Sequence, residues 1–138
     1  MGLNAVVFKR ASRLKSEYSR EFEVVDVETG EAAAVGDPDL LPLEQLVAAE
    51  ARLGNVAEVA FLRKTVMSVL GEGSFIAEHV LYSGIHSGDC IPTNRLHSLR
   101  DELSRLKKMD VSDLATFISA MEALIDVAEK ESNPIVFV

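Results

Sequence analysis

The sequence predicts an α+β domain in which a small, mainly antiparallel sheet packs against four or five helices. Three observations support this prediction. Short segments rich in β-branched residues lie near both ends of the chain, at 3–9 and 135–138. A hairpin pattern follows the first of them at 21–35. Apolar residues at helical spacing then dominate the second half of the chain.

The composition is that of an ordinary globular protein, with 48% hydrophobic and 26% charged residues among 138. This length predicts a single domain spanning 1–138, long enough to bury a core. A lone cysteine, Cys90, cannot form an internal disulfide, which fits a reducing compartment. The first residues lack the pattern of a signal peptide, and no apolar run reaches the length of a membrane span. We therefore expect a cytoplasmic protein that does not enter the membrane.

The first third of the chain predicts strands. Residues 3–9 form a β-branched segment typical of a strand, whereas 10–20 lack a strong period and are expected to form a loop or a short turn. Residues 21–27 alternate charged and apolar side chains and are followed by a glycine, so we expect a hairpin with 31–35. Its second arm is weak because alanine is a poor strand former. Residues 36–42 are expected to form a loop.

Helical signals follow the hairpin. Residues 42–54 have a proline at their start and a glycine at their end, the arrangement typical of a helix. Asn55 and Glu58 form a capping-box pattern that opens a second helix over 56–70. Residues 74–83 favour a helix capped by a serine, while a strand paired with the hairpin stays open as the alternative.

Two more helices and a short buried strand are predicted in the last third of the chain. Leucines at spacings of three, four and three predict a helix within 93–108. They are Leu96, Leu99, Leu103 and Leu106. Ser112 is expected to cap the final helix, which should end before Pro134. Its apolar stripe comprises Leu114, Phe117, Ile118, Met121, Ile125 and Ala128.

The net charge of −8 is unevenly distributed. Residues 1–20 carry +4 and 93–108 carry +3, whereas 21–58 carry −9 and 109–138 carry −5. An acidic total disfavours nucleic-acid binding, because phosphate neutralisation needs a clustered basic face. The acidic segment 21–58 suits a basic protein partner, since complementary charge speeds association and discriminates between partners. Acidity that serves only solubility stays open as the alternative.

The densest group of reactive side chains is the loop 82–90, with the sequence YSGIHSGDC. It contains two glycines, two serines, a histidine, an aspartate and the only cysteine of the chain. We take five of its residues as candidate binding residues: Tyr82, Ser83, His86, Ser87 and Asp89.

Three chemistries use residue types of this kind. A serine or Cys90 can act as a nucleophile, with His86 as the base and Asp89 as the group that orients it. His79, His86 and Asp89, with Cys90 as a further candidate, carry atoms that bind metals, and the glycines and serines offer N–H and hydroxyl groups to an anion. The nucleophile elbow, the common zinc spacings and the P-loop are absent from the sequence. We therefore name no catalytic residue, no metal ligand and no cofactor.

The loop also has a purely structural interpretation. Gly84 and Gly88 flank His86 at equal spacing, and a positive φ at both would turn the backbone on each side of the imidazole. Ser87 and Asp89 would then be turn formers that hydrogen-bond the local backbone. His86 favours the functional interpretation, because a plain connector does not need a histidine.

Two stretches, MGLNAVVF at 1–8 and VLYSGIHSGD at 80–89, together with the leucine-spaced helix that follows, resemble a group of small bacterial proteins of unassigned function. The characteristic part is Tyr82-Ser83-Gly84 with His86-Ser87-Gly88-Asp89. Proteins of this size and acidity are often immunity or accessory proteins encoded beside secreted toxins. The resemblance implies a bacterial cytoplasmic protein with a protein partner, and it supplies no catalytic residue.

These observations lead to one main hypothesis and one alternative. The main hypothesis is a non-enzymatic binding protein of immunity or inhibitor type, which uses the acidic segment 21–58 and the loop 82–90 to engage a basic protein partner. The alternative is a small enzyme or a metal-binding protein that uses His86 and Asp89. It requires His86 to point into a cleft and to have a perturbed pKa.

Overall fold

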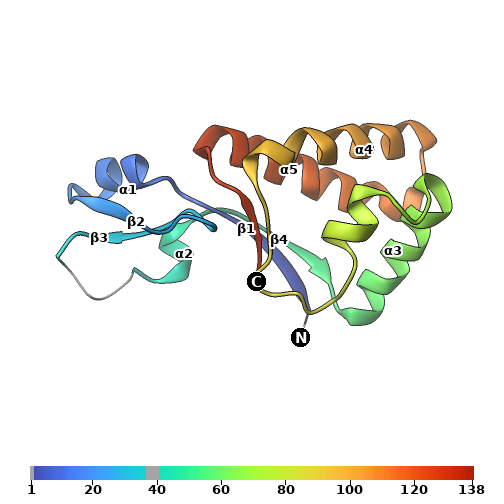
Figure 1. Ribbon diagram of the computed structural model, residues 1–138, viewed down its shortest axis with the longest axis horizontal. Helices are drawn as coiled ribbons and strands as arrows, with labels where there is room; N and C mark the ends of the chain where they lie inside the picture. Colours follow the sequence, from blue (N-terminus) through green and yellow to red (C-terminus); the bar gives the residue numbers. More distant parts are fainter. Residues whose placement is uncertain (1, 37–40) are drawn as a thin grey trace.

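A four-stranded antiparallel sheet lies at the centre of the computed structural model, which describes residues 2–36 and 41–138 (Figure 1). The strand order is β4-β1-β6-β5, so the first and the last strand of the chain are neighbours. The bounds are Leu3–Phe8 for β1, Val47–Gly54 for β4, Cys90–Ile91 for β5 and Ile135–Phe137 for β6. The α+β class is confirmed, as are the strands predicted near both ends of the chain.

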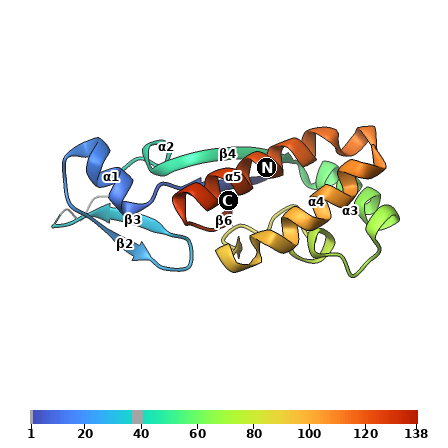
Figure 2. The same ribbon diagram turned by 90° about the horizontal axis from the view of Figure 1, so that it is seen from above.

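Three long helices of the described residues pack on one face of this sheet: α3 (Val56–Leu70), α4 (Leu96–Met109) and α5 (Ala115–Glu131). Figure 2 shows α5 between β4 and α4. Shorter elements lie between them: a π-helical turn at Ile76–Val80 and 3₁₀ turns at Thr93–Arg95 and Ser112–Leu114. At 74–83 the predicted helix is therefore the one observed and the strand is not, but its helical part is limited to 75–80.

The helices predicted from apolar spacing lie where the sequence places them. The capping box of Asn55 and Glu58 is present at the start of α3. The predicted leucines of α4 and the predicted stripe at the final helix are buried. Ser112 does not cap α5 directly, because a 3₁₀ turn precedes that helix and its N-cap residue makes no side-chain hydrogen bond.

A smaller lobe covers part of the opposite face of the sheet. It consists of α1 (Ala11–Tyr18), β2 (Phe22–Asp26), β3 (Glu31–Ala34) and the short helix α2 (Leu43–Leu46). β2 and β3 form the predicted hairpin, which is a separate two-stranded sheet. Figure 1 shows this lobe at the end of the molecule opposite to α3.

β1 contributes to both cores, because neighbouring side chains of a strand point to opposite faces of the sheet. Leu3, Ala5 and Val7 are buried in the larger core, with the helices. Val6 and Phe8 are buried in the smaller core, with the lobe. The other buried members of the smaller core are Leu14, Phe22, Ala32, Ala34, Leu46 and Val136.

The helix predicted over 42–54 is wrong for most of its length. The helix ends at Leu46, and Val47–Gly54 form β4, which pairs antiparallel with β1. Glu50 and Arg52 are exposed, while the residues between and beside them face the helical core. The inward-facing residues are Ala49, Ala51 and Leu53. Alanine favours helices and hides this alternation of period two, so the pairing with β1 overrides local propensity.

The loop predicted over 10–20 is also wrong, because it contains α1. This helix has eight residues and one buried side chain, Leu14, so it shows no apolar period in the sequence. It ends at Ser19, which adopts the left-handed conformation with φ of 51°. The loop predicted over 36–42 lies mainly outside the described residues.

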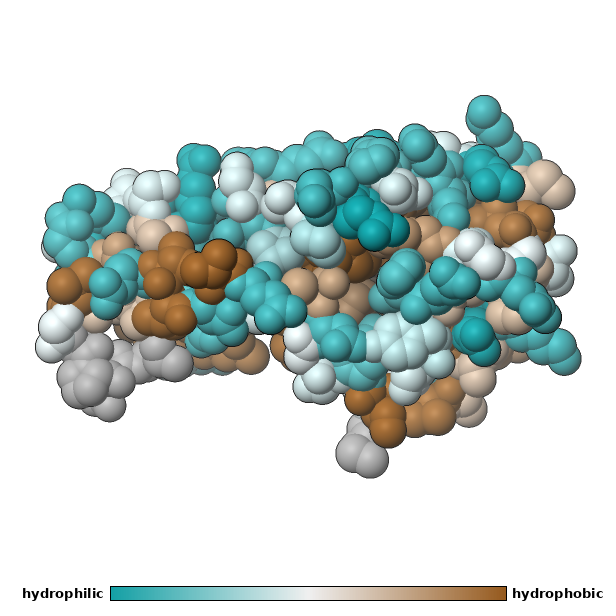
Figure 3. Space-filling model, in the orientation of Figure 1, coloured by the Kyte–Doolittle hydropathy of each residue, from teal (hydrophilic) through white to brown (hydrophobic). Residues whose placement is uncertain are grey.

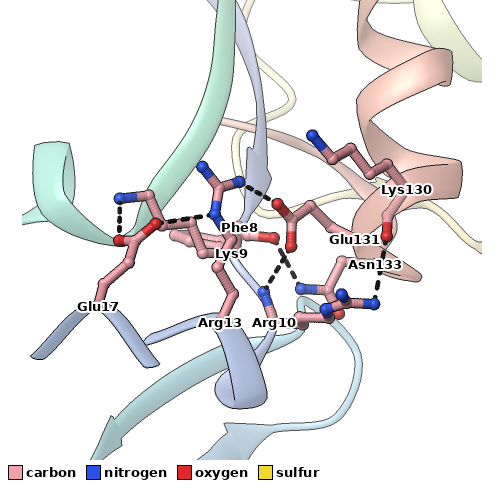
Figure 4. A network of polar contacts seen from close by, with 8 residues as sticks. All are labelled: Phe8, Lys9, Arg10, Arg13, Glu17, Lys130, Glu131 and Asn133. Atoms are coloured by element: carbon pink, nitrogen blue, oxygen red, sulfur yellow. Dashed lines mark hydrogen bonds and ion pairs between the residues drawn. The ribbon is translucent and has the colours of Figure 1, made fainter. Parts of the chain in front are cut away.

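A cluster of charged side chains links α1 to the end of α5 through ion pairs and hydrogen bonds (Figure 4). The carboxylate of Glu131, a residue only 1% exposed, pairs with Arg13 and accepts a hydrogen bond from the backbone N–H of Arg10 at 3.2 Å. Arg13 also pairs with Glu17, which pairs with Lys9, both at 2.9 Å. We call these residues the Glu131 cluster. Because a buried charge is tolerated only when it is paired, the cluster holds the lobe against the helices.

Candidate functional site

The loop 82–90 is held at both of its ends. Before it, the Glu102 carboxylate on α4 accepts two backbone N–H hydrogen bonds, at 2.6 and 2.9 Å, from the start of the helical segment that contains Ile76–Val80. After it, the backbone N–H of Phe137 donates to the carbonyl oxygen of Asp89 at 2.8 Å. The loop is thus a short excursion between a turn anchored to α4 and the strand β5.

His86 lies beneath the loop. The residue is 8% exposed, and its ring contacts the rings of Tyr82 and Phe137, with centroids 4.2 and 4.5 Å away. Its Nε2 atom lies 2.8 Å from the carbonyl oxygen of Val80. Because a carbonyl oxygen can only accept, Nε2 carries the proton, and a neutral ring then presents Nδ1 as an acceptor.

The buried Nδ1 atom of His86 has no hydrogen-bond partner among the described residues. Asp89 Oδ2 lies 3.7 Å from it, which is beyond hydrogen-bond distance. Burial lowers the pKa of His86, and the hydrogen bond to the Val80 carbonyl opposes this shift only in part. The imidazole is therefore neutral at neutral pH.

The two glycines of the loop are needed for different reasons. Gly88 has a φ of 98°, in the region that side chains disfavour. Gly84 does not, so a positive φ at both glycines is wrong. A Cβ atom at Gly84 would lie 2.8 Å from the Cα atom of Val56, the first residue of α3. Gly84 therefore allows the loop to pack closely against that helix.

The exposed side chains of the loop are those of Tyr82, Ile85, Ser87 and Asp89, and Gly88 is exposed as well. Ile85 is 67% exposed, and its backbone N–H donates to the half-buried Ser83 hydroxyl at 3.2 Å. Three of the five candidate residues are thus at the surface, while the histidine lies below them. Sequence reasoning missed Ile85; a large apolar side chain inside a polar loop was the available signal.

The first residues of the loop line a cavity of about 470 Å³ together with α3. Residues 82–84 form one part of the wall, and Arg63 and Lys64 belong to the part contributed by α3. His86 is not among the described residues that line it. The imidazole therefore does not reach a molecule bound in this cavity.

The described residues form no catalytic or metal-binding arrangement around His86. None of their hydroxyl or thiol groups hydrogen-bonds to its ring, and they contain no group of three side chains able to hold a metal ion. His79 is exposed, with its ring against that of Phe75. Burial, together with nearby carboxylates, raises the pKa of the Cys90 thiol, so the thiol is protonated and a weak nucleophile.

The acidic segment and the loop meet at Cys90. Its thiol donates to the carbonyl oxygen of Glu28 at 3.5 Å. Glu28 lies in the hairpin turn, where the Asp26 carboxylate accepts hydrogen bonds from the backbone N–H groups of Glu28 and Thr29 at 2.9 and 3.3 Å. Glu28, Asp89 and Asp26 all act electrostatically on the thiol. Carboxylates from both segments therefore surround this residue.

The hairpin also exposes apolar side chains. Val24, Val25 and Val27 are 49%, 51% and 90% exposed. Figure 3 shows apolar side chains gathered on the lobe among hydrophilic ones. An exposed apolar patch rimmed by polar groups marks an interaction site. We define the hairpin surface as the exposed side chains on both faces of the hairpin, namely these three valines with Glu23, Asp26 and Glu28, together with Asp89.

None of the described helices combines the length and the apolar character needed to cross a membrane. Comparisons with known proteins found no matching family model, no matching curated protein and no matching solved structure.

Proposed function

We propose that this chain is a non-enzymatic binding protein of immunity or inhibitor type, which engages a basic protein partner through the hairpin surface. The observation that carries the proposal is the contact between Cys90 and Glu28. At this contact the acidic hairpin and the end of the loop 82–90 become one continuous surface, to which the loop contributes Asp89.

The carboxylates of this surface are available to a partner. Glu23 and Glu28 are exposed and have no ion-pair partner among the described residues, whereas the neighbouring Glu21 pairs with Lys15. Like charges held close together repel one another, and a basic partner would relieve that repulsion. Their field would also accelerate the encounter with such a partner.

The three valines supply an apolar centre that charge alone lacks. Protein interfaces combine a buried apolar core with a polar rim, and the core supplies most of the binding energy. In the hairpin surface, Val24, Val25 and Val27 correspond to the core and the carboxylates to the rim. This combination supports a protein partner over a small cation, which would need only the carboxylates.

The alternative, chemistry at His86 and Asp89, has less support. The imidazole is buried and neutral, and Asp89 is too far from it for a hydrogen bond. The only part of the loop that lines the adjacent cavity, among the described residues, is 82–84. Binding through the hairpin surface requires none of these groups to reach a reacting atom.

Affinity capture with the full chain as bait tests the proposal. The bait is immobilised and exposed to a lysate of its source organism at low and at moderate salt. We expect a basic protein that is retained at low salt and partly released at moderate salt. The Glu23→Lys/Glu28→Lys bait should lose it, because both carboxylates of the rim are reversed.

A matched control reverses charge elsewhere on the surface. Glu72 is exposed in the turn after α3, and it has no ion-pair partner among the described residues. Glu72→Lys should retain the captured protein. Recovery of no basic protein, or equal capture by all three baits, would contradict the proposal.

A further inference from the structure

The outer edge of β4 is unpaired in the described chain. The strand order places β4 at one end of the sheet, with β1 as its only neighbour. Figure 2 shows β4 along the margin of the molecule, with α5 and α4 on one side of it and, on the other, only α2 at its start among the described elements. At eight residues, β4 is also the longest strand of the described sheet. A free edge of this kind is a template for another strand.

The pairing with β1 determines which backbone groups of β4 are free. The backbone N–H and C=O groups of Asn4 both hydrogen-bond to Val138, on the β6 side of β1. Because these groups alternate in direction along a strand, those of the neighbouring residues in β1 point towards β4. Ala5 pairs with Ala51. Val7, two residues further along β1, pairs with Ala49. Ala49 and Ala51 therefore bond to β1. The N–H and C=O groups of Glu50 and Arg52 point away from it.

These two outward residues carry opposite charges. Both side chains are exposed, and neither has an ion-pair partner among the described residues. We propose that β4 pairs with β4 of a second copy of this chain, antiparallel and centred on Ala51, so that Glu50 of each copy lies opposite Arg52 of the other. Each such pair exchanges both of its backbone hydrogen bonds and joins opposite charges across the strands.

The charges also select this register over its neighbours. In a pairing centred on Glu50, the two Glu50 carboxylates lie opposite each other. In a pairing centred on Arg52, the two Arg52 guanidinium groups lie opposite each other. Like charges directly opposite each other destabilise a strand pair. In a register centred between two residues, the outward backbone N–H and C=O groups of one copy would lie opposite backbone groups of the other copy that already hydrogen-bond to β1. The register centred on Ala51 is the one that satisfies both the backbone and the charges.

A groove of about 500 Å³ opens at the C-terminal end of the same strand. Residues 52–54 line it together with side chains of α3 and α5, among them Phe61, which is 53% exposed. In an antiparallel pair, the start of the second β4 lies at this end. The exposed Leu43 precedes that start. The pairing therefore brings this exposed leucine of the second copy to the end of β4 at which the groove opens, and the two-fold axis repeats the arrangement.

Sedimentation equilibrium over micromolar to millimolar concentration tests the proposal, which does not depend on any partner of the hairpin surface. We expect a reversible dimer. Glu50→Arg and Arg52→Glu, taken singly, place like charges in both symmetric pairs and should each raise the dimer dissociation constant about tenfold or more. Both residues are exposed, so circular dichroism should show unchanged folding.

Mixing the two single variants supplies the decisive control. In the mixed dimer every Arg lies opposite a Glu, so the equimolar mixture should dimerise about as strongly as the wild type although neither variant does so alone. The double variant Glu50→Arg/Arg52→Glu should also recover. A wild-type chain that stays monomeric throughout, or a mixture that does not recover, would overturn the proposal.

Amide hydrogen exchange gives a second readout that needs no substitution. In the dimer, the N–H groups of Glu50 and Arg52 become bonded, while those of Ala49 and Ala51 are bonded in either state. Protection should therefore rise with protein concentration at 50 and 52 and stay constant at 49 and 51. If amide exchange at 50 and 52 did not change with protein concentration, the proposed pairing would be contradicted, even if a dimer formed through another surface.

Discussion

The imidazole of His86 joins the loop 82–90 to the turn before it, because its Nε2–H donates to the carbonyl oxygen of Val80 at 2.8 Å. The same ring contacts Phe137, from the other end of the chain. The histidine thus connects the loop with the neighbouring turn and with β6, near the C-terminus. Its effect on any function of the loop acts through the shape that these contacts impose.

Replacement of His86 by alanine should destabilise the protein by about 2 kcal/mol or more. The change removes a buried ring and leaves the Val80 carbonyl without its partner. Urea denaturation of the full chain measures the loss. His97→Ala is the matched control, since His97 is exposed on α4 and its removal should change stability by less than about 0.5 kcal/mol. Equal stability of the two variants would show that the contacts of His86 contribute little.

The stability of the fold should fall as the pH drops below the ordinary histidine pKa of about 6.5. Burial lowers the pKa of His86 in the folded chain, so in this window the unfolded chain binds a proton that the folded chain does not. Stability therefore rises with pH up to this value and is lost as the pH falls towards the lower pKa of the folded state. The dependence should be weaker in His86→Gln, because glutamine binds no proton at this position in either state. Parallel pH profiles for the two proteins would argue against a lowered pKa.

Alanine at either glycine of the loop should cost about 1 kcal/mol or more, with the larger loss at Gly84. At Gly88 the cost comes from the positive φ, and at Gly84 from contact with the Cα atom of Val56, which cannot move without shifting α3. Gly73→Ala is the control, because Gly73 has an ordinary φ and open space around it. Thermal unfolding would rank the three variants. A Gly84→Ala protein as stable as Gly73→Ala would contradict the close packing.

Neutralising the buried carboxylate of the Glu131 cluster should also destabilise the protein. Glu131→Gln keeps an acceptor for the Arg10 N–H but removes the charge that pairs with Arg13, and we expect a loss of about 1–3 kcal/mol. A double-mutant cycle with Arg13→Gln isolates the pair, whose energy is reduced because Arg13 is partly exposed. Additive effects of the two substitutions would show that the pair itself contributes nothing.

The sequence predicts the parts of this fold whose signals are local. The capping box of Asn55 and Glu58 and the leucines of α4 need no tertiary information, because helix caps and apolar stripes act within a few residues. β4 depends on β1, whose paired residues lie 39 to 51 positions earlier in the chain, and its alanines favour a helix until that pairing forms. α1 likewise depends on one buried leucine and on a carboxylate from α5.

The candidate site is also predicted by the sequence only in its local features. The composition of the loop 82–90 marks it as unusual, and one of its glycines does hold a positive φ. The sequence does not show that His86 turns inward, because its contacts come from Val80 and from Phe137 at the end of the chain. Nor does it show that the loop ends against the hairpin turn, since Cys90 and Glu28 are brought together only by the folded sheet and lobe.

Because both cores share strand β1, the strand affects how the protein unfolds. Val6 and Phe8 belong to the core of the lobe, while their neighbours in the strand belong to the core of the helices. Neither core can lose this strand without exposing the other. Melting of the lobe therefore exposes Val6 and Phe8 on the sheet that supports the helices, and we expect calorimetry to record one cooperative transition for both.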